Sequence, residues 1–370
     1  MEMFRLASST AEDWADAVQA TIDGLGKLPA GTNLGFLYVT DRLAGDSARI
    51  LAYLRERTGI PHWIGTVGVG ILAGRDEYFD RPALAVMTGA VPERLFRVFP
   101  SLNESAGELG VEITRWAQEA APTFGIVHGD PANSKIVDVI DEMAQSLSCF
   151  LVGALTASRS ETHQFADGIT GGGISGILLS PEAAVATGLT QGCSPVGPVH
   201  LVSEGIDNIL MGLDGKRALD VFMEEMGERL GPNFTKAASR LHVALPIEGS
   251  DTGDYLVRNL VGIDPNRGWI GVGCAVKPGD RIMFVRRDRN SARGDLKTMV
   301  EKVLARAGGA PKGALYVSCV ARGPNMFGNA GEASVLHEVL GDIPLIGIYA
   351  NGEISNNRLY GYTGVLTLFL

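Results

Sequence analysis

The sequence repeats one supersecondary pattern three times, and this repetition constrains the fold more than any other feature. Each copy contains an apolar strand, a helical segment, a second apolar strand, a glycine-containing turn and a third strand, over roughly 55–60 residues. The copies begin at residues 34, 124 and 314, and their last strands cover residues 83–87, 171–179 and 362–370. Three copies of a unit that contains both strands and helices predict an α/β fold.

The turn sequences predict sheets that are not uniformly parallel. Four strand candidates between residues 242 and 286 are joined by residues 264–266 and 277–280, which are turn sequences of the kind that connects antiparallel strands. We therefore expect an α/β fold of the α+β type, in which mixed, largely antiparallel sheets are flanked by helices. We expect two such sheets, built from the repeated strand-helix-strand-hairpin units.

A helix breaker predicts the division of the chain into two regions. A helical pattern begins at Ala218, and Gly231-Pro232-Asn233 interrupts it. We expect one region over residues 1–231 and a second over residues 232–370.

Composition excludes several functional classes. The chain has 370 residues and a net charge of −10, and it lacks a basic cluster interleaved with aromatic residues. Neither nucleic acid nor a membrane is therefore an expected partner, because both bind through neutralised phosphates. The four cysteines are far apart and no histidine lies at metal-ligand spacing, so we expect no metal and no cofactor. The N-terminal segment lacks the apolar region of a signal peptide, which predicts a cytoplasmic protein.

The third copy carries most of the candidate chemistry. A buried strand ends at Cys319 and is followed by Arg322, and the turn Asn351-Gly352 leads from the next strand to Glu353 and, nine residues later, to Tyr362. We expect the strand 345–349 and the strand 362–370 to form a hairpin around this turn. If the strands before Cys319 and Asn351 are neighbours, their carboxyl ends lie side by side.

An arginine and a glutamate at one strand end suit a small zwitterion. The guanidinium of Arg322 would bind a carboxylate in bidentate fashion, and Glu353 would accept hydrogen bonds from an ammonium group. A structural ion pair between Arg322 and Glu353 that closes the sheet end remains an open alternative.

Three other residues are weaker candidates. Arg258, inside the apolar run 255–264, points to solvent, pairs with Asp264 or contacts a ligand. Cys193 follows a glycine in a candidate strand pair. Cys319 is a candidate nucleophile with His128 as its base, although free cysteines are commonly buried apolar residues.

Six landmarks, in matching order and spacing, resemble the FIST domain family. They are residues 192–198, residues 213–215, residues 255–264, Ser318 to Gly323, Asn351 to Ile354, and Tyr362 to Leu366. The resemblance covers nearly the whole chain, with an N-terminal FIST module to about residue 230 and a C-terminal FIST module after it. It implies a sensory domain of signalling proteins, proposed to bind small ligands such as amino acids. The chain departs from the family at Ser194, where a basic residue is common.

The leading interpretation is a stand-alone cytoplasmic sensory domain without catalytic activity. We expect it to bind an amino acid or a related carboxylate and to act through a separate signalling output protein or as a homo-oligomer, because no output segment follows residue 370. The expected ligand contacts are Arg322, Glu353, Asn351, Gly352, Cys319, Arg258, Cys193 and Tyr362. The alternatives are a thiol-dependent hydrolase or transferase that uses Cys319, and a scaffold that only binds another protein.

Overall fold

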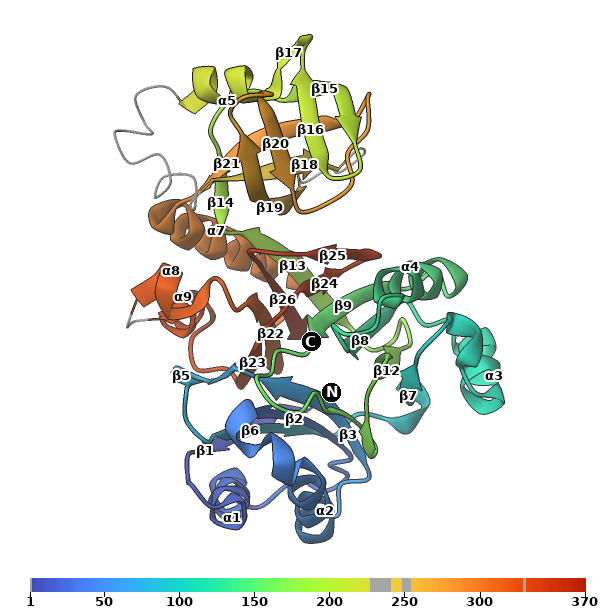
Figure 1. Ribbon diagram of the computed structural model, residues 1–370. Helices are drawn as coiled ribbons and strands as arrows, with labels where there is room; N and C mark the ends of the chain where they lie inside the picture. Colours follow the sequence, from blue (N-terminus) through green and yellow to red (C-terminus); the bar gives the residue numbers. More distant parts are fainter. Residues whose placement is uncertain (1, 227–240, 248–253, 329–330) are drawn as a thin grey trace. The chain divides into compact units, whose positions relative to one another are not determined.

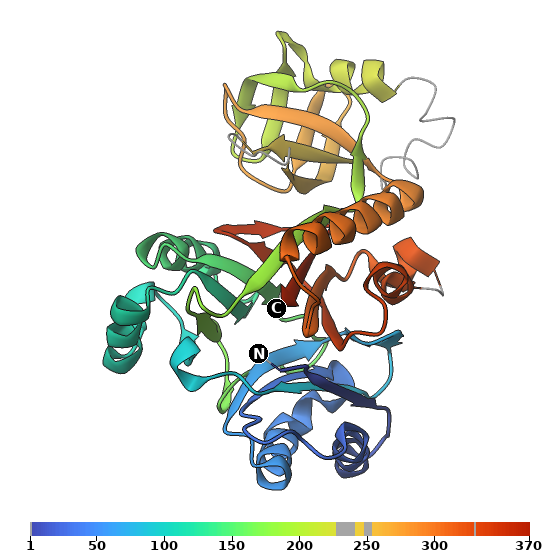
Figure 2. The same ribbon diagram turned by 180° about the vertical axis from the view of Figure 1, so that it is seen from behind.

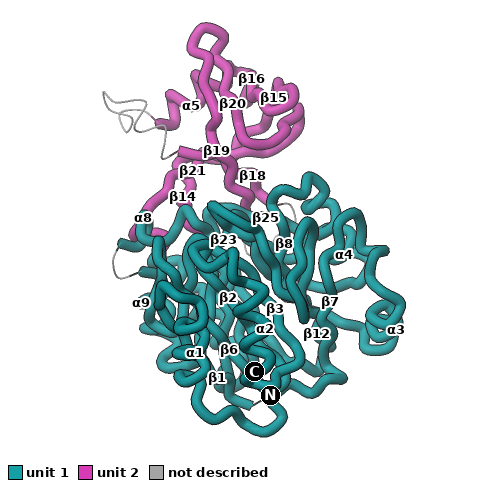
Figure 3. Tube along the Cα trace, turned by 60° about the horizontal axis from the view of Figure 1, so that its bottom comes forward, with its two compact units in different colours: residues 1–190, 293–370 teal, residues 191–292 magenta. Residues whose placement is uncertain are grey.

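The computed structural model describes residues 2–226, 241–247, 254–328 and 331–370 (Figure 1). The chain forms two compact units, Met1–Thr190 with Arg293–Leu370, and Gln191–Ala292 (Figure 3). The boundary expected near residue 231 lies outside the described residues, so it stays a prediction.

The first unit contains three six-stranded sheets, each built around one copy of the repeat. In every copy the first and second strands are parallel neighbours, and the last strand pairs antiparallel with the first. The three strands of each copy are, in turn, β2 (Leu34–Thr40), β3 (His62–Gly68) and β6 (Leu84–Gly89); β8 (Phe124–Gly129), β9 (Phe150–Leu155) and β12 (Ile174–Leu179); β22 (Gly313–Cys319), β23 (Leu345–Ala350) and β26 (Thr363–Phe369). The predicted repeat and the mixed sheets are confirmed, but the expectation of two sheets is wrong.

Each copy gives a short hairpin to the sheet of another copy. The hairpin of the first copy pairs with β23, that of the second copy with β3, and that of the third copy with β9. These hairpins are β4 (Gly70–Ala73) with β5 (Asp76–Phe79), β10 (Gln164–Ala166) with β11 (Ile169–Thr170), and β24 (Glu353–Ser355) with β25 (Arg358–Tyr360). The sheets are completed at their other edges by β1 (Arg5–Ser9), β7 (Phe96–Leu102) and β13 (Val185–Gln191). The exchange is cyclic and ties the three sheets together.

The prediction that residues 345–349 and 362–370 form a hairpin is therefore wrong. Strand β22 lies between β23 and β26, and the turn Asn351-Gly352 leads into β24, which belongs to the sheet of the second copy. Glu353 is the first residue of β24 rather than part of a hairpin bend.

Both faces of these sheets are buried, which explains why the strands are nearly continuous apolar runs. One face of each sheet contributes to a shared core, to which the three copies supply Phe36, Ile126 and Leu315. The opposite faces pack against helices: α1 (Trp14–Leu25) and α2 (Ser47–Thr58) cover the first sheet, and α3 (Val111–Ala120) and α4 (Ile136–Ser146) cover the second (Figure 2). Three further helices are α7 (Arg289–Ala307), α8 (Gly323–Phe327) and α9 (Gly331–Leu340).

The second unit is a closed six-stranded antiparallel barrel. Its strands are, in order around the barrel, β21 (Arg281–Arg287), β15 (His200–Ile206), β16 (Ile209–Leu213), β20 (Trp269–Val272), β19 (Tyr255–Asp264) and β18 (Leu241–Pro246), which pairs with β21 again. Two short strands, β14 (Cys193–Pro195) and β17 (Lys216–Arg217), extend it, and α5 (Ala218–Met226) packs on its core through Phe222. The strands predicted between residues 242 and 286 are confirmed.

Candidate functional site

The three copies can be compared position by position. In each second strand a glycine lies so close to the neighbouring first strand that a Cβ atom there would meet a carbonyl oxygen, at 1.8, 1.8 and 2.6 Å. The glycines are Gly65, Gly153 and Gly347, and the carbonyl oxygens belong to Leu37, Val127 and Tyr316. These contacts identify equivalent positions, and the third copy differs from the others by having a polar residue, Tyr316, in the place of an aliphatic one.

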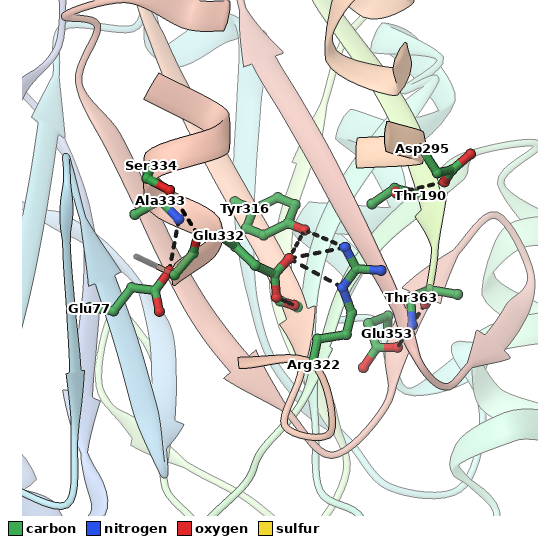
Figure 4. Close-up of polar contacts among 12 residues, drawn as sticks. Glu77, Thr190, Asp295, Tyr316, Arg322, Glu332, Ala333, Ser334, Glu353 and Thr363 are labelled. Atoms are coloured by element: carbon green, nitrogen blue, oxygen red, sulfur yellow. Dashed lines mark hydrogen bonds and ion pairs between the residues drawn. The ribbon is translucent and has the colours of Figure 1, made fainter. Parts of the chain in front are cut away.

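Tyr316 is part of a buried charge network under α8 and α9 (Figure 4). The hydroxyl groups of Tyr316 and Ser318 both donate to the carboxylate of Glu332, the latter over 2.6 Å. Arg322 donates to Glu332 Oε2 from Nε at 3.2 Å and from Nη2 at 3.1 Å, and both charged side chains are fully buried. The guanidinium also lies 5.1 Å from the centre of the Phe327 ring. The ion-pair partner of Arg322 is thus Glu332, not Glu353.

Sequence reasoning missed Glu332. Its signal was present, because Glu332 stands next to Ala333 in a segment whose other buried residues, Val335 and Leu336, form the apolar face of α9. An acidic residue on the apolar face of a helix requires a buried partner.

Glu353 lies close to this network and is fully buried. Its Oε2 atom accepts hydrogen bonds from the backbone N–H of Thr363 at 3.1 Å and from the Thr363 hydroxyl at 2.7 Å. Its Oε1 atom and the Nη1 atom of Arg322 have no nitrogen or oxygen hydrogen-bond partner among the described residues. Burial raises the pKa of Glu353 to about 8, although Thr363, Cys319 and the charge of Arg322 act in the opposite direction.

Cys319 lies against Glu353 at the end of β22. Its sulfur is within hydrogen-bonding reach of the Glu353 carboxyl and of the backbone N–H groups of Ala321 and Tyr362. Burial, and then the charge of Glu353, raise the pKa of the Cys319 thiol. His128, the expected base, instead shares a hydrogen bond of 3.0 Å between its Nε2 atom and the hydroxyl of Tyr38. Because the nucleophile is the thiolate, this environment does not favour thiol chemistry at neutral pH.

The remaining expected contacts of the first unit surround these residues. Asn351 is exposed, and the turn Asn351-Gly352 is held by backbone hydrogen bonds to Leu155 at 3.1 and 2.9 Å. Gly352 has a φ of 149°, and a Cβ atom there would lie 2.8 Å from the Leu359 side chain, so the turn requires glycine. Tyr362 has a φ of 64° and presents its N–H to Cys319.

The structure places Arg258 and Cys193 in the barrel unit. Arg258 on β19 is half-buried and donates from Nη1 to the carbonyl of Val257 at 2.9 Å, and burial lowers its pKa. It does not pair with Asp264, whose carboxylate lies 4.0 Å from Arg267. The carbonyl oxygen of Cys193 accepts a hydrogen bond from the hydroxyl of Tyr255. The barrel therefore holds two of the eight expected contacts, and the first unit holds the other six.

A groove of about 410 Å³ on the first unit contains none of the expected contacts. It is lined by residues 3–6, 24–25, 74–75, 337 and 341–345. Within the described part of the chain, no His, Cys, Asp and Glu side chains gather in a group that could hold a metal ion. The described helices also include none with the length and apolar character of a membrane span.

Comparisons with known proteins extend over the whole chain. The uncharacterized protein Rv0628c of Mycobacterium tuberculosis is 30% identical over 384 residues, with 98% of each chain covered. The uncharacterized protein Mb0898c of Mycobacterium bovis is 30% identical over 371 residues, covering 96% of this chain and 94% of that protein. A crystal structure of cyanuric acid hydrolase from A. caulinodans covers 100% of this chain and 99% of its own, at 10% identity and a TM-score of 0.37, a likeness too low to carry an argument.

Two domain families match adjacent parts of the sequence. The FIST N domain matches residues 33–216, and the FIST C domain matches residues 218–356. Together they include the first two copies of the repeat, the barrel, and the third copy as far as residue 356. The chain belongs to the FIST family of sensory-type modules, with a FIST N domain followed by a FIST C domain.

Proposed function

We propose that this protein is a sensor that binds an amino acid or a related carboxylate at the end of β22, with Arg322 and Glu353 as the charged contacts. One observation carries the proposal: two fully buried titratable side chains each keep one polar atom, Arg322 Nη1 and Glu353 Oε1, without a nitrogen or oxygen hydrogen-bond partner among the described residues. A buried polar atom without a partner costs about 1–3 kcal/mol. A ligand that supplies both partners would offset that cost.

The chemistry of the two atoms suits a zwitterion. Arg322 Nη1 donates and would bind a carboxylate oxygen, whereas ionised Glu353 accepts and would bind an ammonium group. The Nε and Nη2 atoms of Arg322 donate to Glu332, and Nη2 also donates to the Tyr316 hydroxyl, which together hold the guanidinium in one orientation. Such a held arginine binds a ligand without losing further side-chain entropy.

The buried charges are also not a requirement of the repeated fold. The positions equivalent to Arg322 are Leu43 in the first copy and Asn133 in the second, because both follow the equivalent of Cys319 by three residues. The first and second copies therefore fold without a buried guanidinium at this place. We infer that the charge serves binding rather than folding.

Signalling would follow from differential affinity. A ligand shifts a conformational equilibrium only if it binds one conformation more tightly than the other. Because Arg322 and Glu353 are fully buried, a ligand reaches them only in an opened conformation and then favours the closed one. A separate output protein or a second copy of the chain would respond to that change.

The test is a thermal-shift screen of the twenty amino acids and common carboxylates on three proteins: wild type, Arg322→Lys and Arg159→Lys. Lysine keeps a cation for Glu332 but loses the second terminal nitrogen, so it avoids the buried unpaired carboxylate that alanine would leave. Arg159, whose guanidinium is paired with Asp41 elsewhere in the first unit, is the matched control. At 100 times the dissociation constant a ligand adds about 2.7 kcal/mol to stability.

We expect the shift to disappear in Arg322→Lys and to persist in Arg159→Lys. A ligand whose shift is the same in all three proteins binds elsewhere and would overturn the site. If none of the compounds shifts the melting temperature of the wild type, the ligand-sensor proposal itself is refuted.

A further inference from the structure

Three residues form a straight row across the sheet of the second copy. His128 on β8 is directly opposite Ala154 on β9, and Ala154 is directly opposite Glu353 on β24. Directly paired residues of neighbouring strands point to the same face, and neighbouring strands lie about 4.8 Å apart. The side chains of His128 and Glu353 therefore flank a single methyl group, on the face of the sheet that meets the shared core.

Both flanking side chains are fully buried and incompletely hydrogen-bonded. The Nε2 atom of His128 shares its hydrogen bond with Tyr38, while Nδ1 has no partner among the described residues. Glu353 Oε1 also lacks a nitrogen or oxygen partner, because both bonds from Thr363 go to Oε2, and the Cys319 thiol is the other group within hydrogen-bonding reach of this carboxyl. The two residues on either side of Ala154 in the row thus each carry one such atom.

The first copy provides an internal control for this row. The equivalent residues are Tyr38, Thr66 and Gln164, which are directly opposite one another on β2, β3 and β10. Each of these side chains is hydrogen-bonded. Tyr38 bonds to His128, and Thr66 bonds to the hydroxyl of Thr156 at 2.6 Å. Gln164 accepts from the hydroxyl of Ser175 at 2.8 Å and donates to the carbonyl of Gly173 at 3.0 Å. A polar row in this architecture can therefore satisfy all of its side chains.

The third copy shows that the row does not have to be polar. Its equivalent residues are Val317, Ile348 and Ile71, which are all buried and apolar. The fold therefore accepts an apolar row, as in the third copy, or a fully hydrogen-bonded polar row, as in the first. Neither case accounts for the atoms without partners in the second copy. The residue between them, Ala154, is smaller than Thr66 and Ile348, the residues at this position in the other copies.

We propose that His128 Nδ1 and Glu353 Oε1, carried by the residues on either side of Ala154 in this row, form the subsite for a small protonated amine. An ammonium group supplies N–H donors to both atoms when the imidazole carries its proton on Nε2 and donates to Tyr38. Burial lowers the pKa of His128 to about 3, so the imidazole is neutral and Nδ1 is able to accept. The other groups that face Glu353 are the cationic guanidinium of Arg322 and the neutral thiol of Cys319. The inference rests on the proposed ligand site, with which it shares Glu353, and it adds His128 and Ala154 as specificity determinants.

The experiment uses the amine itself as the probe, so it does not depend on the identity of the ligand. Melting temperatures of the full chain are measured in ammonium and methylammonium chloride, with potassium and tetramethylammonium chloride at equal concentrations as controls that lack N–H donors. The variants are Ala154→Thr, which places the larger residue of the first copy between His128 and Glu353, and Glu353→Gln, which installs the residue equivalent to Gln164. Ala117→Thr, at a buried alanine of α3, is the matched control.

We expect ammonium to raise the melting temperature of the wild type and of Ala117→Thr above the value in potassium chloride. We expect at least a tenfold higher ammonium concentration to be needed for the same rise in Ala154→Thr and in Glu353→Gln. An equal response to ammonium, potassium and tetramethylammonium in the wild type would overturn the subsite, and so would an ammonium effect that survives in both variants. A zwitterion whose binding needs Arg322 but is indifferent to Ala154→Thr would leave the proposed function standing and refute this inference alone.

Discussion

The buried carboxyl group of Glu353 should make the stability of the first unit depend on pH. Its pKa is about 8 in the folded chain, against 4.5 for an ordinary glutamate, and burial is the main cause. An acid with a raised pKa binds its proton more tightly in the folded state, so its contribution to stability is complete below pH 4.5 and is lost as the pH rises through 8. The full difference corresponds to about 5 kcal/mol, and about 3–4 kcal/mol of it falls between pH 5 and pH 8.

The perturbation is Glu353→Gln, which keeps the shape of the side chain and removes its titration. We expect the free energy of unfolding of the variant, relative to the wild type, to rise by up to about 3–4 kcal/mol between pH 5 and pH 8, because only the wild type must ionise a buried group. Urea unfolding followed by tryptophan fluorescence measures this in the correct unit, since Trp14, Trp63 and Trp116 belong to the first unit and only Trp269 to the barrel. Glu56→Gln, at an exposed site on α2, is the control. A difference between Glu353→Gln and wild type that stays constant over this range would refute the reasoning.

Three further outcomes follow from the same geometry. Arg322→Ala leaves the carboxylate of Glu332 buried without its cation, so denaturant unfolding should show a loss of about 3–5 kcal/mol, and Glu332→Gln in the same chain should recover part of it. Gly153→Ala places a Cβ atom 1.8 Å from the carbonyl oxygen of Val127 at a φ of 156°, and we expect a loss of about 3 kcal/mol or more, whereas Gly45→Ala, with nothing within 4 Å, should be close to neutral. Iodoacetamide on the native protein should label the half-buried Cys274 before the buried Cys149 and Cys319, and early labelling of Cys319 in a peptide map would contradict the buried thiol described above.

Most of the elements were predictable from local sequence. The strands that end at or near Cys319, His128 and Thr40 are apolar runs bounded by turns, and the helical segment expected in each copy is present as α2 and α4 in the first two copies. The repeat itself was visible because each copy places glycine after its second strand. Proximity of Cys319, Arg322 and Glu353 was also predictable, since β22 and β23 are parallel neighbours as expected.

The pairing of the site residues was not predictable in the same way. Glu353 is carried by a hairpin that crosses to β9 of another copy, and hydrogen bonds between strands far apart in sequence leave no local signal. An ion pair between Arg322 and Glu353 was an open alternative because both residues follow neighbouring strands, but in the structure α9 supplies Glu332 as the partner of Arg322. The packing of α9 decides whether the buried guanidinium of Arg322 pairs with Glu332 or with Glu353. The sequence contains both acids and does not indicate which of them is the partner.

The sequence by itself determined the repeat, the alternation of strands and helices, the family and the residues that could carry charge into the interior. Only the tertiary structure decided that three hairpins are exchanged in a cycle, that β18 closes on β21 to make a barrel, and that His128, Ala154 and Glu353 form one row. The physical reason is that burial and periodicity act over a few neighbouring residues, whereas the identity of a strand's partner depends on the packing of the whole sheet. For that reason the unpaired atoms of Arg322, Glu353 and His128, on which both proposals rest, were visible only in the folded chain.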